Sequence, residues 1–181
     1  MRRFWLAGLA ALCVGALTVR TSGAAIHDHH DRDHDDDEIT LRASLRGAQE
    51  VPPISTGATG SFVATIHPDG SITFRLTYAN LSALPTQSHI HFAQANVSGG
   101  VMIFLCGGDG QPACPAATSG TVDGTIVPAN VVGPSGQGIV AGDLAAALRA
   151  IAGGEGYVNL HSTKFPGVEI RGQLRVHRDD D

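Results

Sequence analysis

The sequence Ser88-His89-Ile90-His91-Phe92 predicts an extended strand with two chemically different faces. Side chains of a strand alternate between its faces, so His89 and His91 point to one side and Ile90 and Phe92 to the other. Neutral imidazole is the commonest nitrogen ligand for copper, zinc, iron and nickel in proteins. The pair therefore indicates the beginning of a metal site, and the rest of the chain decides whether other ligands converge on it.

Alternation of apolar and polar side chains predicts further strands along the chain. Residues 71–78 (SITFRLTY) show it best, because every second residue from Ile72 to Tyr78 is apolar. Similar patterns or short apolar runs occur at residues 39–47, 61–67, 88–92, 101–106, 121–127, 157–161 and 168–176. The sequence therefore predicts about eight short strands.

Residues 142–153 (GDLAAALRAIAG) predict the one convincing helix. Asp143 can cap its N-terminus, and Gly153 can end it. Its leucines and isoleucine recur at spacings of three and four, which is typical of a helix with one buried face. We therefore expect a mainly β fold, an antiparallel Greek-key β-sandwich or barrel with one short helix.

The composition indicates one globular domain with tails, since the chain has 181 residues and 23 glycines. The net charge of −5 gives no reason to expect nucleic-acid binding. Much of the acidity is local, in residues 27–38 and 178–181. We expect the β domain at residues 39–176, between a disordered His- and Asp-rich tail (26–38) and a short acidic tail (177–181).

Residues 1–25 have the pattern of a signal peptide. Arg2 and Arg3 precede an apolar run over residues 4–19, and small residues follow up to Ala25. The run is short for a membrane span, so an uncleaved anchor is the less favoured alternative. We therefore expect a secreted or periplasmic protein that has no membrane attachment once the signal peptide is cleaved. The pattern does not define the cleavage site.

Export sets the redox context of the two cysteines that remain, Cys106 and Cys114. They bracket a glycine-rich loop, and in an oxidising compartment such a pair indicates a local disulfide. The alternative is a pair of soft metal ligands, but the spacing fits no zinc ribbon.

The tail before the β domain is rich in histidine and aspartate. It has almost no apolar residue, so it cannot bury enough surface to fold. The residues of this tail that can capture metal weakly are His27, His29, His30 and His34. A solvated tail without any such role is the alternative.

Two later strands also present polar side chains on one face. In residues 157–161, Val158 and Leu160 must face the core, which puts Asn159 and His161 together on the other face. In residues 168–174, Val168, Ile170 and Leu174 are expected to face inward. The polar side chains on the opposite face are then Glu169, Arg171 and Gln173.

If these strands are neighbours, His89, His91 and His161 form a three-imidazole metal site. Asn159 or Glu169 can then orient a ligand from behind it, and Arg171 can place positive charge at an open coordination position. The alternative is that the histidines are ordinary solvent-facing strand residues. Glu169 and Arg171 would then be a surface ion pair, worth under about 1 kcal/mol.

Three motifs occur in order along the chain. They are Glu50-Val51-Pro52-Pro53 within residues 45–60, Ser88-His89-Ile90-His91, and the closing pair Tyr157-Val158-Asn159-Leu160-His161-Ser162 and Pro166-Gly167-Val168-Glu169-Ile170-Arg171-Gly172-Gln173-Leu174. Together they resemble the CHRD domain, named for the BMP antagonist chordin and common in exported microbial proteins. The resemblance covers residues 40–175.

The resemblance to CHRD domains implies little about activity, because members of that family have no agreed enzymatic function. In chordin the domains accompany cysteine-rich growth-factor-binding modules, which this chain lacks, so BMP binding is not expected. The chain departs from the family pattern at Val168 and in the loop between Cys106 and Cys114, which resembles an insertion.

A weaker similarity runs to the copper/zinc superoxide dismutase sandwich. There too a His-x-His strand, a later strand histidine and a late arginine surround copper; His89, His91, His161 and Arg171 match in order and type. This similarity implies copper as the cofactor, in a copper-only or open site, because a metal-bridging histidine and a zinc loop have no counterpart in this sequence.

Three functions follow from these observations. The first is an exported, non-catalytic β domain that binds a metal or an unknown protein partner. The second is a copper-dependent, dismutase-like redox enzyme in which Arg171 attracts the anion. The third is a purely structural extracellular scaffold. Whether the protein is an enzyme stays open at this point, with the balance toward a binding domain.

Overall fold

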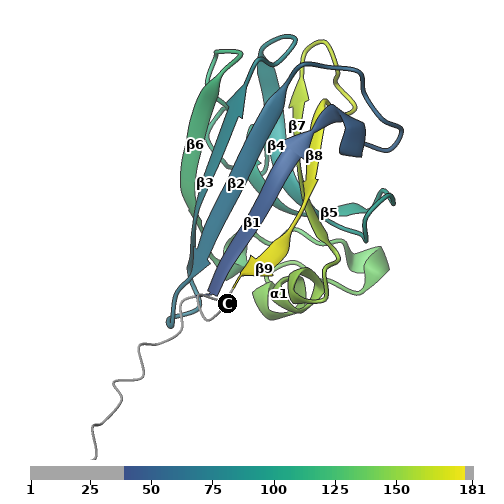
Figure 1. Cartoon of the computed structure of the whole chain (residues 1–181). Coiled ribbons are helices and arrows are strands. Elements are labelled where there is room, and N and C mark those ends of the chain that lie inside the picture. Colours follow the sequence, from purple (N-terminus) through teal and green to yellow (C-terminus); the bar gives the residue numbers. More distant parts are fainter. Residues whose placement is uncertain (1–38, 178–181) are drawn as a thin grey trace, which may run out of the picture. The chain divides into compact units, whose positions relative to one another are not determined.

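The computed structural model describes residues 39–177, which form a mainly antiparallel β fold with nine strands and one α-helix (Figure 1). The predicted signal peptide (1–25), the His- and Asp-rich tail (26–38) and residues 178–181 lie outside the described residues. Among residues 39–177, no helix has the length and apolar character that crossing a membrane requires. The predicted mainly β fold class with a single helix is confirmed.

The strands follow the predicted order along the chain. They are β1 (Ile39–Arg46), β2 (Thr59–Ile66), β3 (Ile72–Ala79), β4 (Pro85–Phe92), β5 (Gly100–Cys106), β6 (Gly120–Ile126), β7 (Gly156–Ser162), β8 (Ile170–Gln173) and β9 (Arg175–His177). Three short 3-10 turns, Gly47–Gln49, Pro128–Asn130 and Ser135–Gln137, lie in the connections, and α1 (Leu144–Ala152) precedes β7.

The strands form one sheet in the order β5-β4-β7-β8-β1-β2-β3-β6, with β9 pairing with β1. Every ladder is antiparallel. The sheet nearly closes into a barrel, since Ile103 of β5 bridges to Val131, just beyond β6. This order places β4, β7 and β8 side by side, although more than sixty residues of chain separate β4 from β7.

Alternation along the strands decides which side chains fill the core. Leu41, Ala43 and Leu45 of β1 are buried, while the alternate residues Arg42, Ser44 and Arg46 are exposed. Phe62 of β2 and Phe74 of β3 stack with ring centroids 5.9 Å apart. Each such large apolar side chain contributes about 1.5–3 kcal/mol when fully buried.

The C-terminal segment differs from the prediction of one strand over residues 168–176. Regular pairing begins only at Ile170, and it is interrupted at Leu174 because the backbone N–H of Leu174 donates to Gly156 of β7. The register along β1 is nevertheless unchanged: Arg171 lies opposite Arg46, and Arg175 opposite Arg42. The prediction that Val168 faces the core is wrong, because it precedes the strand and is only partly buried.

The helix α1 begins where the sequence predicts. Asp143 is its N-cap, and its carboxylate accepts a hydrogen bond of 2.8 Å from the backbone N–H of Ala146. Leu144, Ala147 and Ile151 are buried against the end of the barrel. The predicted helix and cap are confirmed.

Cys106 and Cys114 form the predicted disulfide, which closes the loop after β5. Inside this loop the backbone N–H of Gly107 donates to Pro112 at 2.8 Å. The alternative in which both cysteines are metal ligands is wrong, because their sulfurs are bonded to each other.

Candidate metal centre

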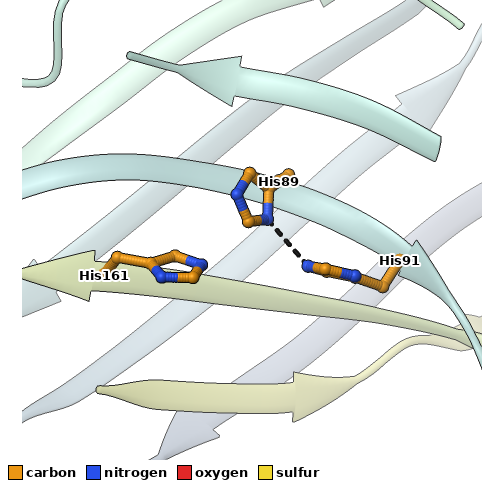
Figure 2. A group of neighbouring side chains, drawn as sticks. All are labelled: His89, His91 and His161. Carbon is orange, nitrogen blue, oxygen red and sulfur yellow. Dashed lines mark hydrogen bonds between the residues drawn. The ribbon is translucent and has the colours of Figure 1, made fainter. Parts of the chain in front are cut away.

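Three histidines meet on one face of the β4–β7 pair (Figure 2). In this ladder His91 lies opposite Tyr157, His89 opposite Asn159, and Gln87 opposite His161. His161 is therefore a diagonal neighbour of His89. One ring nitrogen from each of the three histidines lies within 4.8 Å of the other two, so the structure brings together the three residues that the sequence predicted as metal ligands.

The histidine face of β4 and β7 is turned away from the barrel core, yet it is not open to solvent. The core side of these strands is filled by Ile90, Val158 and Leu160, as alternation predicts. The exposed fractions of His89, His91 and His161 are only 4%, 9% and 6%. The alternative of ordinary solvent-facing histidines is therefore wrong.

Two loops cover this face and leave a groove of about 500 Å³ above it. One wall comes from residues 51–54, between β1 and β2, and the other from residues 164–168, between β7 and β8. The floor is formed by His91, Tyr157, Asn159 and His161.

Backbone carbonyls determine which nitrogen of two imidazoles is protonated. His91 Nδ1 lies 2.8 Å from the carbonyl oxygen of Gly99, and His161 Nδ1 lies 2.9 Å from that of Pro166. A carbonyl oxygen only accepts, so each Nδ1–H donates. The Nε2 atom of each ring then carries a lone pair, which is the atom a metal needs.

The two Nε2 lone pairs have different surroundings. His89 Nδ1 lies 2.8 Å from His91 Nε2, and because His91 Nε2 is an acceptor, His89 Nδ1 donates in the absence of metal. His161 Nε2 is buried and has no hydrogen-bond partner among the described residues. Buried polar atoms are usually paired, so this nitrogen is available to a metal ion or a water molecule.

Burial keeps the three rings neutral. It lowers the pKa of His89 to about 3, with a further contribution from the neighbouring His91 and His161. It also lowers the pKa of His91 and of His161, against the opposing effect of their carbonyl partners. Neutral imidazole is the form that binds metals.

Asn159 lies opposite His89 in the β4–β7 ladder. Its side chain is close enough to His89 and His91 to offset part of the burial effect on the pKa of both. Its amide oxygen is buried without a hydrogen bond of ordinary geometry. Asn159 therefore lies where the sequence expected a residue that orients the ligands.

Arg171 is buried, with 2% of its surface exposed, and packs on an aromatic ring. Its guanidinium carbon lies 3.4 Å from the ring centroid of Tyr157, and the other ring neighbour of Tyr157 is His91, stacked in parallel at 4.7 Å. An Nη2–H of Arg171 also donates to Gln94 at 3.1 Å. Arg171 does not line the groove, so it lies behind Tyr157 instead of projecting into the space above the histidines.

Glu169 does not lie where the alternating pattern put it, because β8 begins only after it. Its carboxylate accepts hydrogen bonds from the Thr56 hydroxyl at 2.9 Å and from the Ser82 backbone N–H at 2.8 Å. Burial alone would raise the pKa of Glu169, but hydrogen bonds from Ser162, Ser82 and Thr56 outweigh it and lower the pKa. Glu169 ties loops together, while the orienting contact to His161 comes from the Pro166 carbonyl.

Glu50 is a buried carboxyl group that sequence reasoning did not single out as a site residue. It is 4% exposed, and burial raises its pKa to about 7 although Arg171 acts in the opposite direction. Its one signal in the sequence is membership of the Glu50-Val51-Pro52-Pro53 motif. The cluster of Glu50, Arg171 and Tyr157 borders the histidine site from the β8 side.

The histidines proposed as a weak tail site, His27, His29, His30 and His34, lie outside the described residues. Comparison of the chain with curated proteins and with solved structures gave no match. The family model described as the CHRD domain matches residues 41–174, which includes all three motifs and every site residue named above from Glu50 onward. The chain therefore belongs to the CHRD domain family.

Proposed function

We propose that this CHRD-domain protein is exported and binds one transition-metal ion, with copper as the preferred ion, without turning over a substrate. The ligand atoms are His89 Nδ1 and the Nε2 atoms of His91 and His161. His89 Nδ1 is free to bind once its proton moves to Nε2 of the same ring, because the metal replaces the hydrogen bond to His91. The observation that carries the proposal is the buried, unpartnered Nε2 of His161, facing two further imidazole nitrogens.

The spacing of the ligand atoms supports a single ion. With metal–nitrogen bonds of about 2.0–2.1 Å, two ligands on one ion lie about 2.9 Å apart at a right angle and about 3.3 Å at the tetrahedral angle. His89 Nδ1 and His91 Nε2 are 2.8 Å apart. His161 needs a small side-chain rotation, since the atoms of the set spread over at most 4.8 Å.

Copper fits this ligand set best among the common divalent ions. Imidazole suits copper, and copper(II) has the highest place in the usual order of affinities for nitrogen ligands. The proposed ligands include no carboxylate, which the harder ions magnesium and calcium prefer.

A binding role agrees better with the position of Arg171 than a dismutase-like reaction does. Attraction of an anion to copper needs a guanidinium at the open coordination position. Arg171 instead stacks on Tyr157 and donates to the Gln94 carbonyl, and it does not line the groove. Export is supported by the Cys106–Cys114 disulfide, since disulfides persist mainly in oxidising compartments.

The test is a competitive copper titration of the full-length chain and of its His161→Gln variant. We expect the variant to bind copper at the folded site roughly 100-fold more weakly or not at all, since even residues behind the ligands alter affinity about 10–100-fold. Both proteins keep the N-terminal histidines, so any tail binding contributes equally. The control is His177→Gln, which removes an exposed imidazole at the end of β9.

Equal copper affinity in the wild type and in His161→Gln would remove the proposal. A superoxide assay on the copper-loaded protein separates binding from catalysis. We expect the rate of superoxide dismutation to be no higher than that of His161→Gln given the same amount of copper. A clear excess in the wild type would support the dismutase-like alternative instead.

A further inference from the structure

Resting on the proposed metal site, we infer that the ion takes the carboxylate of a small apolar acid as its exchangeable ligand, with the apolar body of that acid seated in the groove above the histidines. The shape, charge and chemical nature of the groove each support this inference.

The accessible side of the histidine set faces the groove. His91 and His161 form part of its floor, together with Tyr157 and Asn159. His89 does not line the groove and packs edge-on against Phe104, with ring centroids 5.0 Å apart. An ion held by the three nitrogens is therefore closed on the His89 side, and a further ligand can reach it only from the groove.

Charge favours an anionic ligand there. Three neutral imidazoles leave a divalent ion with both of its positive charges, and a buried charge needs compensation. No acidic residue lines the groove, and its one charged lining residue within the described chain is Lys164. Glu169, the acidic residue next to the wall, is already engaged with Thr56 and Ser82.

The walls favour an apolar body. Val51, Pro52 and Ile54 form one wall, and Phe165 and Val168 belong to the other. All five side chains are partly exposed, so a ligand that covers them removes apolar surface from water. A volume of about 500 Å³ lies within the range of sites for small organic molecules, about 300–1,000 Å³.

The experiment uses the full-length chain loaded with one equivalent of copper(II). Benzoate, acetate and benzyl alcohol are titrated in turn, and the copper d–d absorption band and the electron paramagnetic resonance spectrum are recorded. The same titrations on His161→Gln give the background from copper on the N-terminal histidines. We expect benzoate to shift the spectra at a concentration at least tenfold lower than acetate, and benzyl alcohol to leave them unchanged.

Two groove variants separate the contributions of wall and charge. Ile54→Ser should weaken the binding of benzoate about fivefold and leave the binding of acetate unchanged, because this substitution alters only the apolar wall. Lys164→Gln should weaken the binding of benzoate and of acetate by a similar factor, because it removes a positive charge from the groove. The control is Val140→Ser, which changes a 57% exposed valine that does not line the groove and should have no effect.

The outcomes distinguish this inference from the proposed function. Copper that binds in a His161-dependent way, but with no spectral response to benzoate or with equal affinity for benzoate and acetate, would overturn the inference and leave the metal site standing. Copper binding that does not depend on His161 would overturn the proposed function and the inference with it.

Discussion

His89, His91 and His161 show how much of this site depends on single atoms. Burial keeps each ring neutral, and the carbonyls of Gly99 and Pro166 fix the tautomers of two of them. A proton and a metal ion compete for the same lone pairs. The lowered pKa values therefore determine the pH at which this competition begins.

We predict that the copper affinity of the folded site falls less between pH 7.5 and pH 5.5 than the copper affinity of ordinary histidines does. Ordinary histidines gain protons as the pH falls through about 6.5. Here the pKa of His89 is lowered to about 3, and those of His91 and His161 are also lowered, so protons compete only at lower pH. Competition titrations at pH 7.5, 6.5 and 5.5 measure the effect.

The matched protein for the pH series is His161→Gln, in which the residual copper lies on histidines outside the folded site. Ordinary imidazoles gain protons below about pH 6.5, so this copper should be released as the pH falls below that value. If the wild type loses its tightest copper in parallel with this variant, the folded site does not protect its ligands from protonation.

The loop between β1 and β2 is the element that encloses the site. It folds back on itself, as the Ile54 backbone N–H donates to Gly47 at 2.8 Å, and it is tied to Glu169 through Thr56. A side chain at Gly47 would overlap the Ile54 carbonyl oxygen and Thr56, which explains a glycine there. The loop carries Glu50 into a buried position beside Arg171.

We predict that Glu50→Gln is more stable relative to the wild type at pH 8 than it is at pH 5. The pKa of Glu50 is about 7 in the folded chain and about 4.5 in an unfolded one, so the folded state holds its proton more tightly. Its contribution to stability is therefore lost as the pH rises from about 4.5 to about 7, whereas glutamine does not ionise. The shift corresponds to about 3 kcal/mol, at 1.36 kcal/mol per pKa unit.

Urea unfolding of the wild type and Glu50→Gln at pH 5 and pH 8 measures this difference. All other titrating groups are shared by the two proteins, so their effects cancel in the comparison. The exposed Glu155→Gln serves as the control and should match the wild type at both pH values. A constant difference between wild type and Glu50→Gln across this range would contradict the prediction.

At the scale of the molecule, the candidate site belongs to the nearly closed sheet and not to any one segment. Two ligands come from β4 and the third from β7, which pair only because the barrel order places them side by side. The site therefore exists in the folded state alone. A metal that binds only the native state stabilises it by mass action.

We predict that copper raises the midpoint of thermal unfolding by about 5–10 °C at a free concentration 100 times its dissociation constant. Such an excess adds about 2.7 kcal/mol, and each kcal/mol raises the midpoint by about 2–4 °C for a chain of this size. Circular dichroism melts with and without copper measure the shift. The midpoint of His161→Gln should rise little when copper is added. An equal rise in the wild type and in His161→Gln would show that the stabilising copper binds elsewhere.

The sequence alone determined the strands up to β7, the capped helix, the family and the face on which each of His89, His91 and His161 lies. It could do so because strand alternation, helix capping and short motifs are local properties of the chain. The disulfide was also predictable, since its two cysteines are only eight residues apart.

Only the tertiary structure decided what surrounds the imidazoles. The pairing of β4 with β7 and the covering loop that buries Glu50 depend on segments distant in sequence. The carbonyls of Gly99 and Pro166 are close in sequence to His91 and His161, but they reach these rings only through the paths of the loops that follow β4 and β7. Alternation misplaced Glu169 because β8 begins only at Ile170, two residues later than predicted, and it did not reveal that Arg171 packs on Tyr157. Local periodicity assigns a side chain to a face, whereas its contacts depend on register and on the paths of loops, which only the folded chain determines.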